Sequence, residues 1–307
     1  MTPPPELPAD PASAAVLGDR RGVVWRQNRL SRMKVMMASD SGHVGRSNED
    51  FVGAVPGAVV LLDGAGIPET DSICRHGVAW YSHTLGTALL GQLPREPGMD
   101  LVTALADSIE QVSGQHRHTC DIADPRSPQS TVAIIRFDAD RADFLVLADV
   151  FVVLDSAEAG PQVVTDSREV EVRNECSSVL RGLPTDTPEY ERTKLSVIDA
   201  LRTRRNQPGG YWIAKDDPHA ATQAVTGSVP LGQLNGAALL SNGASRVVDP
   251  YRLAEWPAVL ELMRTMGPNE IIRRVREAET LTQATDSIPD SRLPDDATVA
   301  YCETGRT

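Results

Sequence analysis

Short apolar runs, separated by polar and turn-forming residues, occupy much of the chain from residue 33 onward. Many of these runs are rich in β-branched and aromatic residues, a composition typical of strands. Pro56-Gly57 separates two of the runs and predicts a hairpin turn between them. The predicted strands are 33–38, 51–54, 58–62, 130–137, 144–147, 150–154, 162–165, 234–240 and 297–301.

Other segments repeat their apolar residues at helical spacing. Asp100 precedes one of them and is a candidate N-cap, and Pro268 stands at a plausible first-turn position of another. The predicted helices are 71–92, 100–114, 189–204, 255–266 and 268–280. The order of elements is strands, two helices, more strands, then helices and a last strand. This order predicts an α+β sandwich rather than a parallel sheet built from βαβ units.

The two ends of the chain differ from this pattern in composition. Residues 1–20 contain Pro3, Pro4, Pro5, Pro8 and Pro11 among small residues and predict a disordered tail. The remaining residues, 21–307, are predicted to form a single domain, and the polar segment 281–294 is predicted to be a linker.

Charge and composition exclude several classes of function. With 30 Lys+Arg against 42 Asp+Glu the formal charge is −12, which argues against nucleic acid as the primary partner. No apolar run is long enough to span a bilayer, so no membrane association is expected. The N-terminus does not have a basic segment followed by an apolar one, and the four cysteines form no CxxC pair. A cytoplasmic protein with reduced thiols is therefore expected.

Acidic residues gather where predicted strands begin or end. Glu49-Asp50 precedes one strand, Asp63-Gly64 follows another, Asp295-Asp296 precedes the last, and Asn242-Gly243 follows a fourth. A single Asp-Gly after a strand is more often only a turn. Several carboxylates converging on one edge would repel each other unless a cation lay between them, and Mg²⁺ and Mn²⁺ prefer such oxygen ligands. Four sites of this form in one chain favour a divalent cation centre.

In this order the motifs resemble those of the metal-dependent PPM (type 2C) serine/threonine protein phosphatases. The resemblance covers about residues 35–302, and its departures suggest a distant bacterial branch such as an actinobacterial one. The order of the motifs along the chain carries the resemblance, and no single motif is specific. The matching stretches are Arg-Ser-Asn-Glu-Asp at 46–50, Val-Leu-Leu-Asp-Gly-Ala-Gly at 60–66, Ser-Thr-Val-Ala at 130–133, Leu-Ala-Asp-Val at 147–150, Leu-Ser-Asn-Gly-Ala-Ser at 240–245 and Asp-Asp-Ala-Thr-Val at 295–299.

The resemblance implies a four-layer αββα sandwich of two antiparallel sheets flanked by helices, with two Mn²⁺ or Mg²⁺ ions at one end. By motif position, Asp63 would bridge the two ions and the Gly64 carbonyl would join it. Glu49 would ligate the second ion, directly or through water. Asp50 would support the site, and Asp295 would ligate the first ion. A hydroxide between the ions would attack the phosphorus of a phosphoserine or phosphothreonine on a protein substrate.

Three departures from the family pattern bear on this assignment. Asn242 replaces an aspartate, which removes a negative charge beside the first ion and predicts weaker binding of that ion. The phosphate-binding arginine of the family would fall at Gly45. Arg46, one residue later, either reaches the phosphate or pairs with a neighbouring acid. Ala65 stands where some members have a histidine, and many bacterial members also lack that histidine.

Other polar groups have competing interpretations. Asp296 is either a water-mediated ligand or a turn residue, and the turn is favoured. Asp149 is equally well a ligand of a weak third ion or a turn carboxylate. The group His116–Cys120 is interpreted as a chance cluster, because no second ligand pair stands at zinc-finger spacing. His76 and His83 are interpreted as helix-surface or core-edge residues, and 202–205 as a solvated helix end, with recognition of a phosphorylated partner as the alternative.

The leading hypothesis is therefore a metal-dependent phosphatase whose partner is a phosphoprotein substrate. A pseudophosphatase that binds a phosphoprotein or regulates a partner, with a metal site weakened by Asn242, is the second hypothesis. Action on a small phosphorylated metabolite is the third.

Overall fold

The computed structural model describes residues 33–43, 45–66, 72–156, 158–283 and 294–304. The predicted tail over residues 1–20 lies outside these ranges, and so does most of the predicted linker. Among the described residues, no helix is long and apolar enough to cross a membrane.

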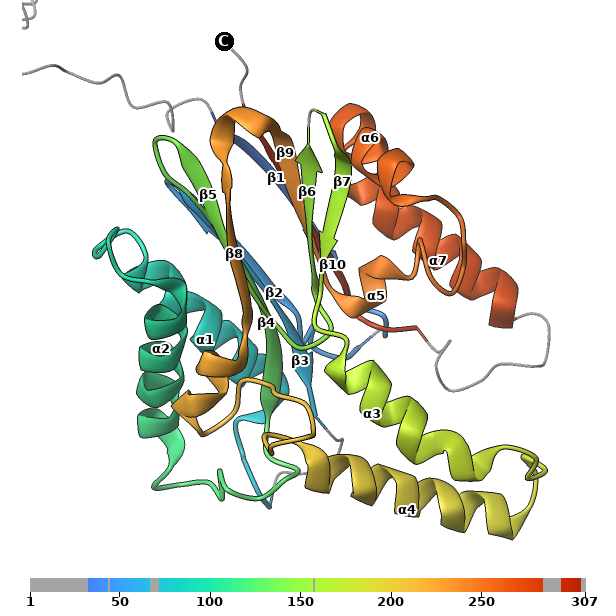
Figure 1. The fold of residues 1–307 in the computed structure, drawn as a ribbon. Coiled ribbons are helices and arrows are strands. Elements are labelled where there is room, and N and C mark those ends of the chain that lie inside the picture. The colour runs from blue at the N-terminus through green and yellow to red at the C-terminus, as the bar shows by residue number, and fades with distance from the viewer. Residues whose placement is uncertain (1–32, 44, 67–71, 157, 284–293, 305–307) are drawn as a thin grey trace, which may run out of the picture.

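Two five-stranded antiparallel sheets pack face to face (Figure 1). The first sheet has the order β2-β3-β4-β5-β8 and the second has the order β1-β10-β9-β6-β7. The strands of the first are β2 (Phe51–Val55), β3 (Ala58–Ala65), β4 (Gln129–Phe137), β5 (Arg141–Leu147) and β8 (Val225–Pro230). Those of the second are β1 (Lys34–Asp40), β10 (Ala297–Glu303), β9 (Leu234–Leu240), β6 (Phe151–Ser156) and β7 (Gly160–Val164).

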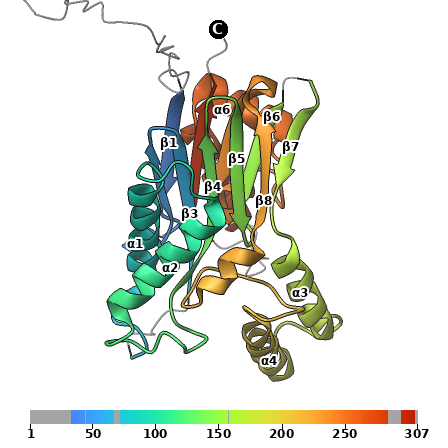
Figure 2. The same cartoon turned by 60° about the vertical axis from the view of Figure 1, so that its left-hand side comes forward.

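Helices cover the outer face of each sheet (Figure 2). The first sheet is covered by α1 (Gly77–Gln92) and α2 (Leu101–His116), and the second by α6 (Trp256–Met266) and α7 (Asn269–Gln283). The short helix α5 (Asn242–Ser245) follows β9 directly. Two more helices, α3 (Arg168–Ser177) and α4 (Pro188–Arg204), lie side by side beyond one end of the sheets (Figure 1).

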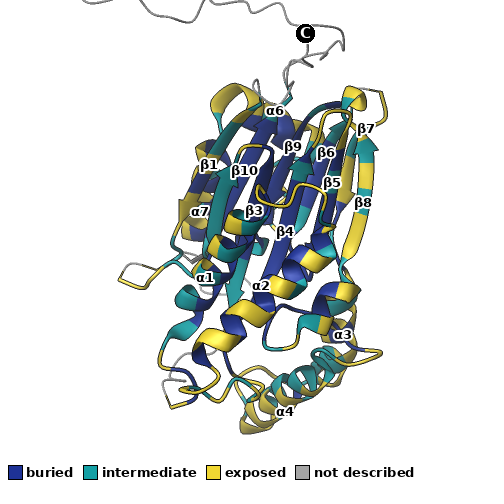
Figure 3. Ribbon diagram, turned by 90° about the vertical axis from the view of Figure 1, so that its left-hand side faces the viewer, coloured by how far each residue is buried: buried dark blue, intermediate teal, exposed yellow. Residues whose placement is uncertain are grey.

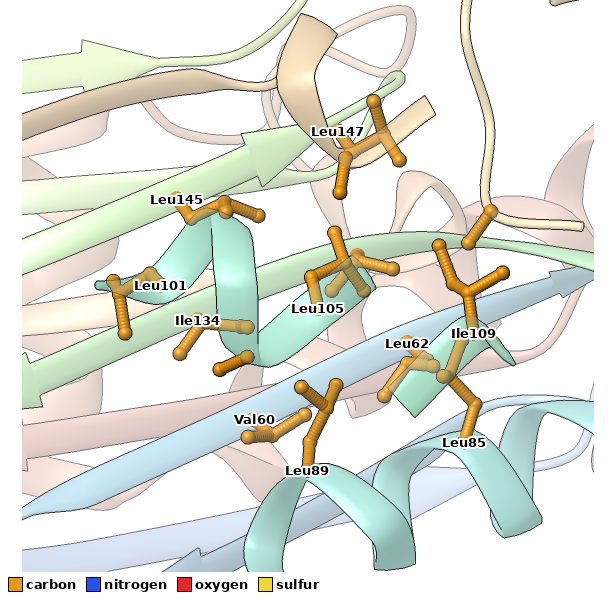
Figure 4. Packing of buried hydrophobic residues seen from close by; sticks show 14 of the residues in the cluster. Val60, Leu62, Leu85, Leu89, Leu101, Leu105, Ile109, Ile134, Leu145 and Leu147 are labelled. Carbon is orange, nitrogen blue, oxygen red and sulfur yellow. The ribbon is translucent and has the colours of Figure 1, made fainter. Parts of the chain in front are cut away.

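Apolar residues fill the three spaces between the four layers. The strands are accordingly buried along much of their length (Figure 3). The space beneath α1 and α2 holds leucine and isoleucine side chains from both helices and from β3, β4 and β5 (Figure 4). A second cluster lies between the sheets, and a third lies between β9, β10 and helices α5 to α7. Burial of this much apolar surface is the main source of the stability of the sandwich.

The α+β sandwich predicted from the sequence is confirmed, including the Pro56-Gly57 hairpin between β2 and β3. Asp100 caps α2 as predicted, since its carboxylate accepts a hydrogen bond from the Thr103 backbone N–H at 2.9 Å. The helix predicted over 71–92 begins only at Gly77.

Several features of the fold were not predicted from the sequence. The strands β5 and β6 do not pair with each other, because residues 148–150 carry the chain from the first sheet to the second. At this crossing Ala148 has a φ of 66°, a conformation that L-residues rarely adopt. Helix α3 and edge strand β8 were not predicted. Each buries few side chains, so neither has a clear apolar period.

Candidate metal centre

The strand register brings four strand ends together at one end of the sandwich. Phe51 pairs with Leu62, so Asp50 and Asp63, the next residue of each strand, lie at the same edge of the first sheet. In the second sheet Leu240 pairs with both Val299 and Phe151. Asn242 lies shortly after Leu240, and Asp295 and Asp149 lie shortly before Val299 and Phe151. The motifs that are far apart in the sequence therefore meet in space.

A polar cavity of about 390 Å³ lies at this end. Five of the site residues predicted from the sequence line it, and they come from both sheets. These are Glu49, Asp63, Gly64, Asn242 and Asp295. Asp50 is buried and Arg46 is exposed, and neither lines the cavity.

Burial and crowding of the carboxyl groups raise their pKa values. The pKa of Asp63 lies well above its usual value because the group is buried and faces Asp50, Asp295 and Asp149. Burial, with a smaller contribution from nearby acids, raises the pKa of Glu49 to about 6 and that of Asp50 to about 7. The pKa of Asp149 is raised to about 7, by burial first and then by Glu169. This centre is therefore short of positive charge.

Asn242 connects two of these carboxylates. Its backbone N–H donates to Asp63 Oδ2 at 2.9 Å, and its side-chain Nδ2 donates to Asp149 Oδ2, also at 2.9 Å. An aspartate at this position would place another negative charge beside Asp149 instead of a donor. The substitution therefore lowers the repulsion within the centre.

Arg246 contributes a positive charge that the sequence interpretation did not include. Its Nη2 donates to Asp295 Oδ2 at 2.8 Å, and its Nη1 lies 3.6 Å from Glu279 Oε1. The Arg246 and Glu279 side chains are only 11% and 3% exposed, so this ion pair is shielded from water. A guanidinium thus already pairs with the carboxylate assigned to the first ion.

Two glycines allow the backbone to pack closely at this end. A Cβ at Gly64 would overlap the carbonyl oxygen of Glu49, and a Cβ at Gly243 would overlap that of Asp296. Asp63-Gly64 lies within β3 and Asn242-Gly243 opens α5, so neither pair forms the turn expected from the sequence, and the close backbone approach is what requires glycine.

Asp296 and α1 hold the segment that carries Glu49 and Asp50. The Asp296 carboxylate accepts hydrogen bonds from the backbone N–H groups of Gly42 and Glu49, which accounts for this residue without a ligand role. From α1, Ser82 Oγ donates to the Glu49 carbonyl, and His83 Nε2 lies 2.9 Å from the Asp50 carbonyl oxygen.

The remaining wall of the cavity comes from the part of the chain that the sequence left unassigned. Glu169 and Arg173 of α3 line it, together with Arg205 and Tyr211 from the segment after α4. Arg173 pairs with Glu169, and Arg205 Nε donates to Tyr211 Oη at 3.0 Å. Arg205 belongs to the basic group 202–205, for which recognition of a phosphorylated partner is the alternative interpretation, whereas no local pattern in the sequence singles out Glu169 or Arg173. Only the placement of α3 and α4 below the sheets brings them to the cavity.

The two-sheet sandwich with an oxygen-rich centre defines a class of proteins, and comparison with known proteins identifies it. The pattern described as protein phosphatase 2C matches residues 41–281. The chain belongs to this family. No curated protein sequence matches it.

Several solved structures share the fold. The catalytic domain of the serine/threonine protein phosphatase PstP in complex with two manganese ions has 18% identity and a TM-score of 0.54, covering 88% of this chain and 97% of that one. Stp1, a serine/threonine phosphatase from Staphylococcus aureus, has 14% identity and a TM-score of 0.52, covering 88% and 94%. PppA from Pseudomonas aeruginosa, described as a regulatory component of T6SS, has 16% identity and a TM-score of 0.52, covering 88% and 97%. At these identities the likeness concerns the fold.

The chemistry of the cavity fits a divalent cation on one side better than on the other. Glu49, Asp63 and the Gly64 carbonyl offer oxygen ligands, and Asp50 Oδ2 is buried nearby without a hydrogen-bond partner among the described residues. On the other side, Asn242 is uncharged and Asp295 is paired with Arg246. The two halves of the centre therefore differ in charge.

Proposed function

We propose that this protein is a Mn²⁺- or Mg²⁺-dependent phosphatase that hydrolyses phosphoserine or phosphothreonine on a protein. The observation that carries the proposal is the convergence of Glu49, Asp63 and Asp295 from separate strand ends on one cavity. The family supports phosphatase chemistry, and the manganese ions named for PstP support the choice of cation.

In this proposal Glu49, Asp63 and the Gly64 carbonyl would hold the second ion, and Asp63, Asn242 and Asp295 would hold the first, more weakly bound one. Bound divalent cations supply hydroxide at neutral pH by lowering the pKa of water, and they neutralise the charge of the phosphate. Asp50, which is buried beside the cavity, would support the site from within the protein. Ser82 and His83 keep the Glu49–Asp50 segment in place through its carbonyl groups.

The chain supplies its own positive charges for the phosphate. Arg173 and Arg205 line the wall opposite the strand ends, where their guanidinium groups are suited to a phosphate that enters the cavity. Arg46 is exposed, and its charge lowers the pKa of Glu49 against the larger effect of burial.

The test is hydrolysis of an aryl phosphate with Mn²⁺, with Mg²⁺ and with a chelator. We expect metal-dependent turnover that falls to background in Asp63→Asn, because that change removes the charge shared by both ion sites. Asp199→Asn, an exposed substitution on α4, is the matched control and should retain full activity. Undiminished metal-dependent turnover in Asp63→Asn would contradict the assignment.

The second candidate function is a binding module that has lost catalysis, and a specific observation favours it. On the side of the cavity that would hold the first ion, Asn242 supplies no negative charge and Arg246 is already paired with Asp295. Calorimetry with Mn²⁺ separates the two functions. The module predicts no binding at millimolar Mn²⁺, whereas the phosphatase predicts at least one bound ion per chain.

A further inference from the structure

Four side chains that bind transition metals meet at a second place, where the start of α1 adjoins the end of α2. They are Cys74, His76, His116 and Cys120, and one ligand atom of each lies within 4.8 Å of all the others. Cys74 and His76 precede the first turn of α1, whereas His116 is the last residue of α2 and Cys120 follows it. None of the four lines the carboxylate cavity.

Three of the distances between these atoms are close to those of a tetrahedral zinc site, and all lie within 4.8 Å. Zinc–sulfur bonds of about 2.3 Å and zinc–nitrogen bonds of about 2.0 Å place neighbouring ligand atoms of a tetrahedron about 3.5 Å apart. Cys74 Sγ lies 3.7 Å from His76 Nδ1 and 3.6 Å from His116 Nδ1. Cys120 Sγ lies 3.3 Å from His76 Nδ1.

Backbone groups at the start of α1 contact the Cys74 sulfur. The backbone N–H groups of His76 and Gly77 donate to it, and Gly77 adopts a φ of 77°. Cys74 and His116 are 1% and 2% exposed, so water does not compete freely for their ligand atoms.

Neighbouring groups fix the two imidazole rings. The Trp80 ring stacks on His76 at a centroid distance of 4.4 Å, and its centroid lies 5.0 Å from that of His116. The Asp121 backbone N–H donates to the Ile73 carbonyl at 2.9 Å, which joins the two ligand-bearing segments. These contacts orient the rings before any ion binds, as the outer groups around metal ligands generally do.

We propose that Cys74, His76, His116 and Cys120 bind one Zn²⁺ ion as a tetrahedral Cys₂His₂ site that fastens the start of α1 to the end of α2. On binding, the two thiols release their protons to solvent, and the two thiolates balance the charge of the ion. All four positions are filled by the protein, so the site is structural and has no open position for a substrate.

The sulfur and nitrogen ligands distinguish this site from the carboxylate cavity, whose oxygens suit Mg²⁺ or Mn²⁺. A disulfide between Cys74 and Cys120 is the competing use of the same sulfurs. It gives no role to the two histidines, yet both direct Nδ1 toward a cysteine sulfur. The histidine placement is the observation that favours the ion.

The experiment uses the full-length protein purified under reducing conditions and reconstituted with Zn²⁺ or Co²⁺. Zinc content is measured by elemental analysis, and the cobalt form by its thiolate-to-metal charge-transfer absorption. The Asp63→Asn background weakens the carboxylate centre, so that the measured ion belongs to the second site. We expect about one zinc per chain and a charge-transfer band in this background.

Adding Cys74→Ser or Cys120→Ser should remove both signals, whereas Cys176→Ser should leave them unchanged, since Cys176 lies on α3. If Cys74→Ser does not fold, Cys120→Ser decides, because Cys120 is half-buried and its loss is better tolerated. If the Asp63→Asn protein binds no zinc and shows no charge-transfer band, the proposal is overturned. It is also overturned if both signals remain after Cys120→Ser is added. A disulfide is assigned instead if two results are found together. The unreduced, metal-free chain has a mass lower by two hydrogens, a difference that Cys74→Ser abolishes, and the reduced chain takes up no zinc.

Discussion

At the residue scale, Arg246 and Asn242 change the charge of the proposed phosphatase centre in the same direction. Asn242 supplies donors to Asp63 and Asp149, and Arg246 supplies a cation to Asp295. The carboxylates on this side are therefore stabilised by the protein itself. An incoming metal ion must compete with the Arg246 guanidinium for Asp295.

Restoring the acid should strengthen Mn²⁺ binding. We expect Asn242→Asp to raise the affinity of the weaker ion by about tenfold or more, because a unit charge a few ångströms from a cation is worth several kcal/mol even in a partly screened site. Calorimetric titration with Mn²⁺ measures the change. Asn235→Asp, the same substitution near the other end of β9, is the control and should leave the affinity as it is. An unchanged affinity in Asn242→Asp would mean that the residue does not contact the ion.

The candidate site was predictable from the sequence only where its residues belong to local motifs. Glu49, Asp63 and Asp295 each adjoin a strand with a strong apolar pattern, so their shared edge follows from the strand assignments. Arg246 lies in no such motif. The interpretation of His116–Cys120 as a chance cluster rested on the lack of a second ligand pair, and the structure places Cys74 and His76 there. This contact depends on how α1 and α2 pack.

At the element scale, α2 shows how one side chain determines where a helix begins. Asp100 accepts hydrogen bonds from both the backbone N–H and the hydroxyl of Thr103, at 2.9 Å and 2.6 Å. The hydrogen bonds lower the pKa of Asp100 below its usual value, so the cap is charged at neutral pH. Leu105 and Ile109 of the same helix then face the sheet (Figure 4).

Removing this cap should destabilise the fold measurably. We expect Asp100→Ala to lower the free energy of unfolding by about 1 kcal/mol, since a helix N-terminus without its cap leaves backbone donors unsatisfied. Urea denaturation followed by circular dichroism measures the change. Asp107→Ala, on the exposed face in the middle of α2, should change stability by less. Equal losses of stability in Asp100→Ala and Asp107→Ala would show that Asp100 acts only through its charge and not through its hydrogen bonds to the helix N-terminus.

The elements that were predicted well from the sequence have a strong apolar pattern. The strands among them bury apolar residues on both faces, and the helices bury them along one whole side. The central strands β3, β4 and β9 and the helices α1 and α2 belong to this group. Helix α3 buries only Val172, and β8 contains a glycine and a proline, so their conformations depend on neighbours. Between β5 and β6 the chain passes from the first sheet to the second. This crossing depends on tertiary packing, which strand propensities do not determine.

At the scale of the whole molecule, the centre makes stability depend on pH and on cations together. Glu49, Asp50 and Asp149 have folded-state pKa values of about 6, 7 and 7, raised mainly by burial above their usual values near 4. Between about pH 4 and pH 7 the unfolded chain gives up these protons first. In the absence of metal, this cluster therefore lowers stability as the pH rises through that window.

A bound divalent cation should offset this loss, because it stabilises the ionised carboxylates. We expect Mn²⁺ to raise the melting temperature more at pH 7.5 than at pH 5, where protons compete with the metal. Calorimetric melting with and without Mn²⁺ at the two pH values measures the difference. In Asp63→Asn the Mn²⁺ effect should shrink at both pH values. A Mn²⁺ effect that is equal at pH 5 and pH 7.5 would contradict the coupling.

The centre takes its residues from both sheets: Glu49 and Asp63 from the ends of β2 and β3, and Asn242 and Asp295 from those of β9 and β10. The contact between Glu49 and Asp296 joins residues 247 positions apart, and such long loops close late in folding. An ion held by residues of both sheets would have to leave before the sheets separate. We therefore expect Mn²⁺ to slow unfolding while leaving the refolding rate unchanged, as seen in the two arms of a chevron plot.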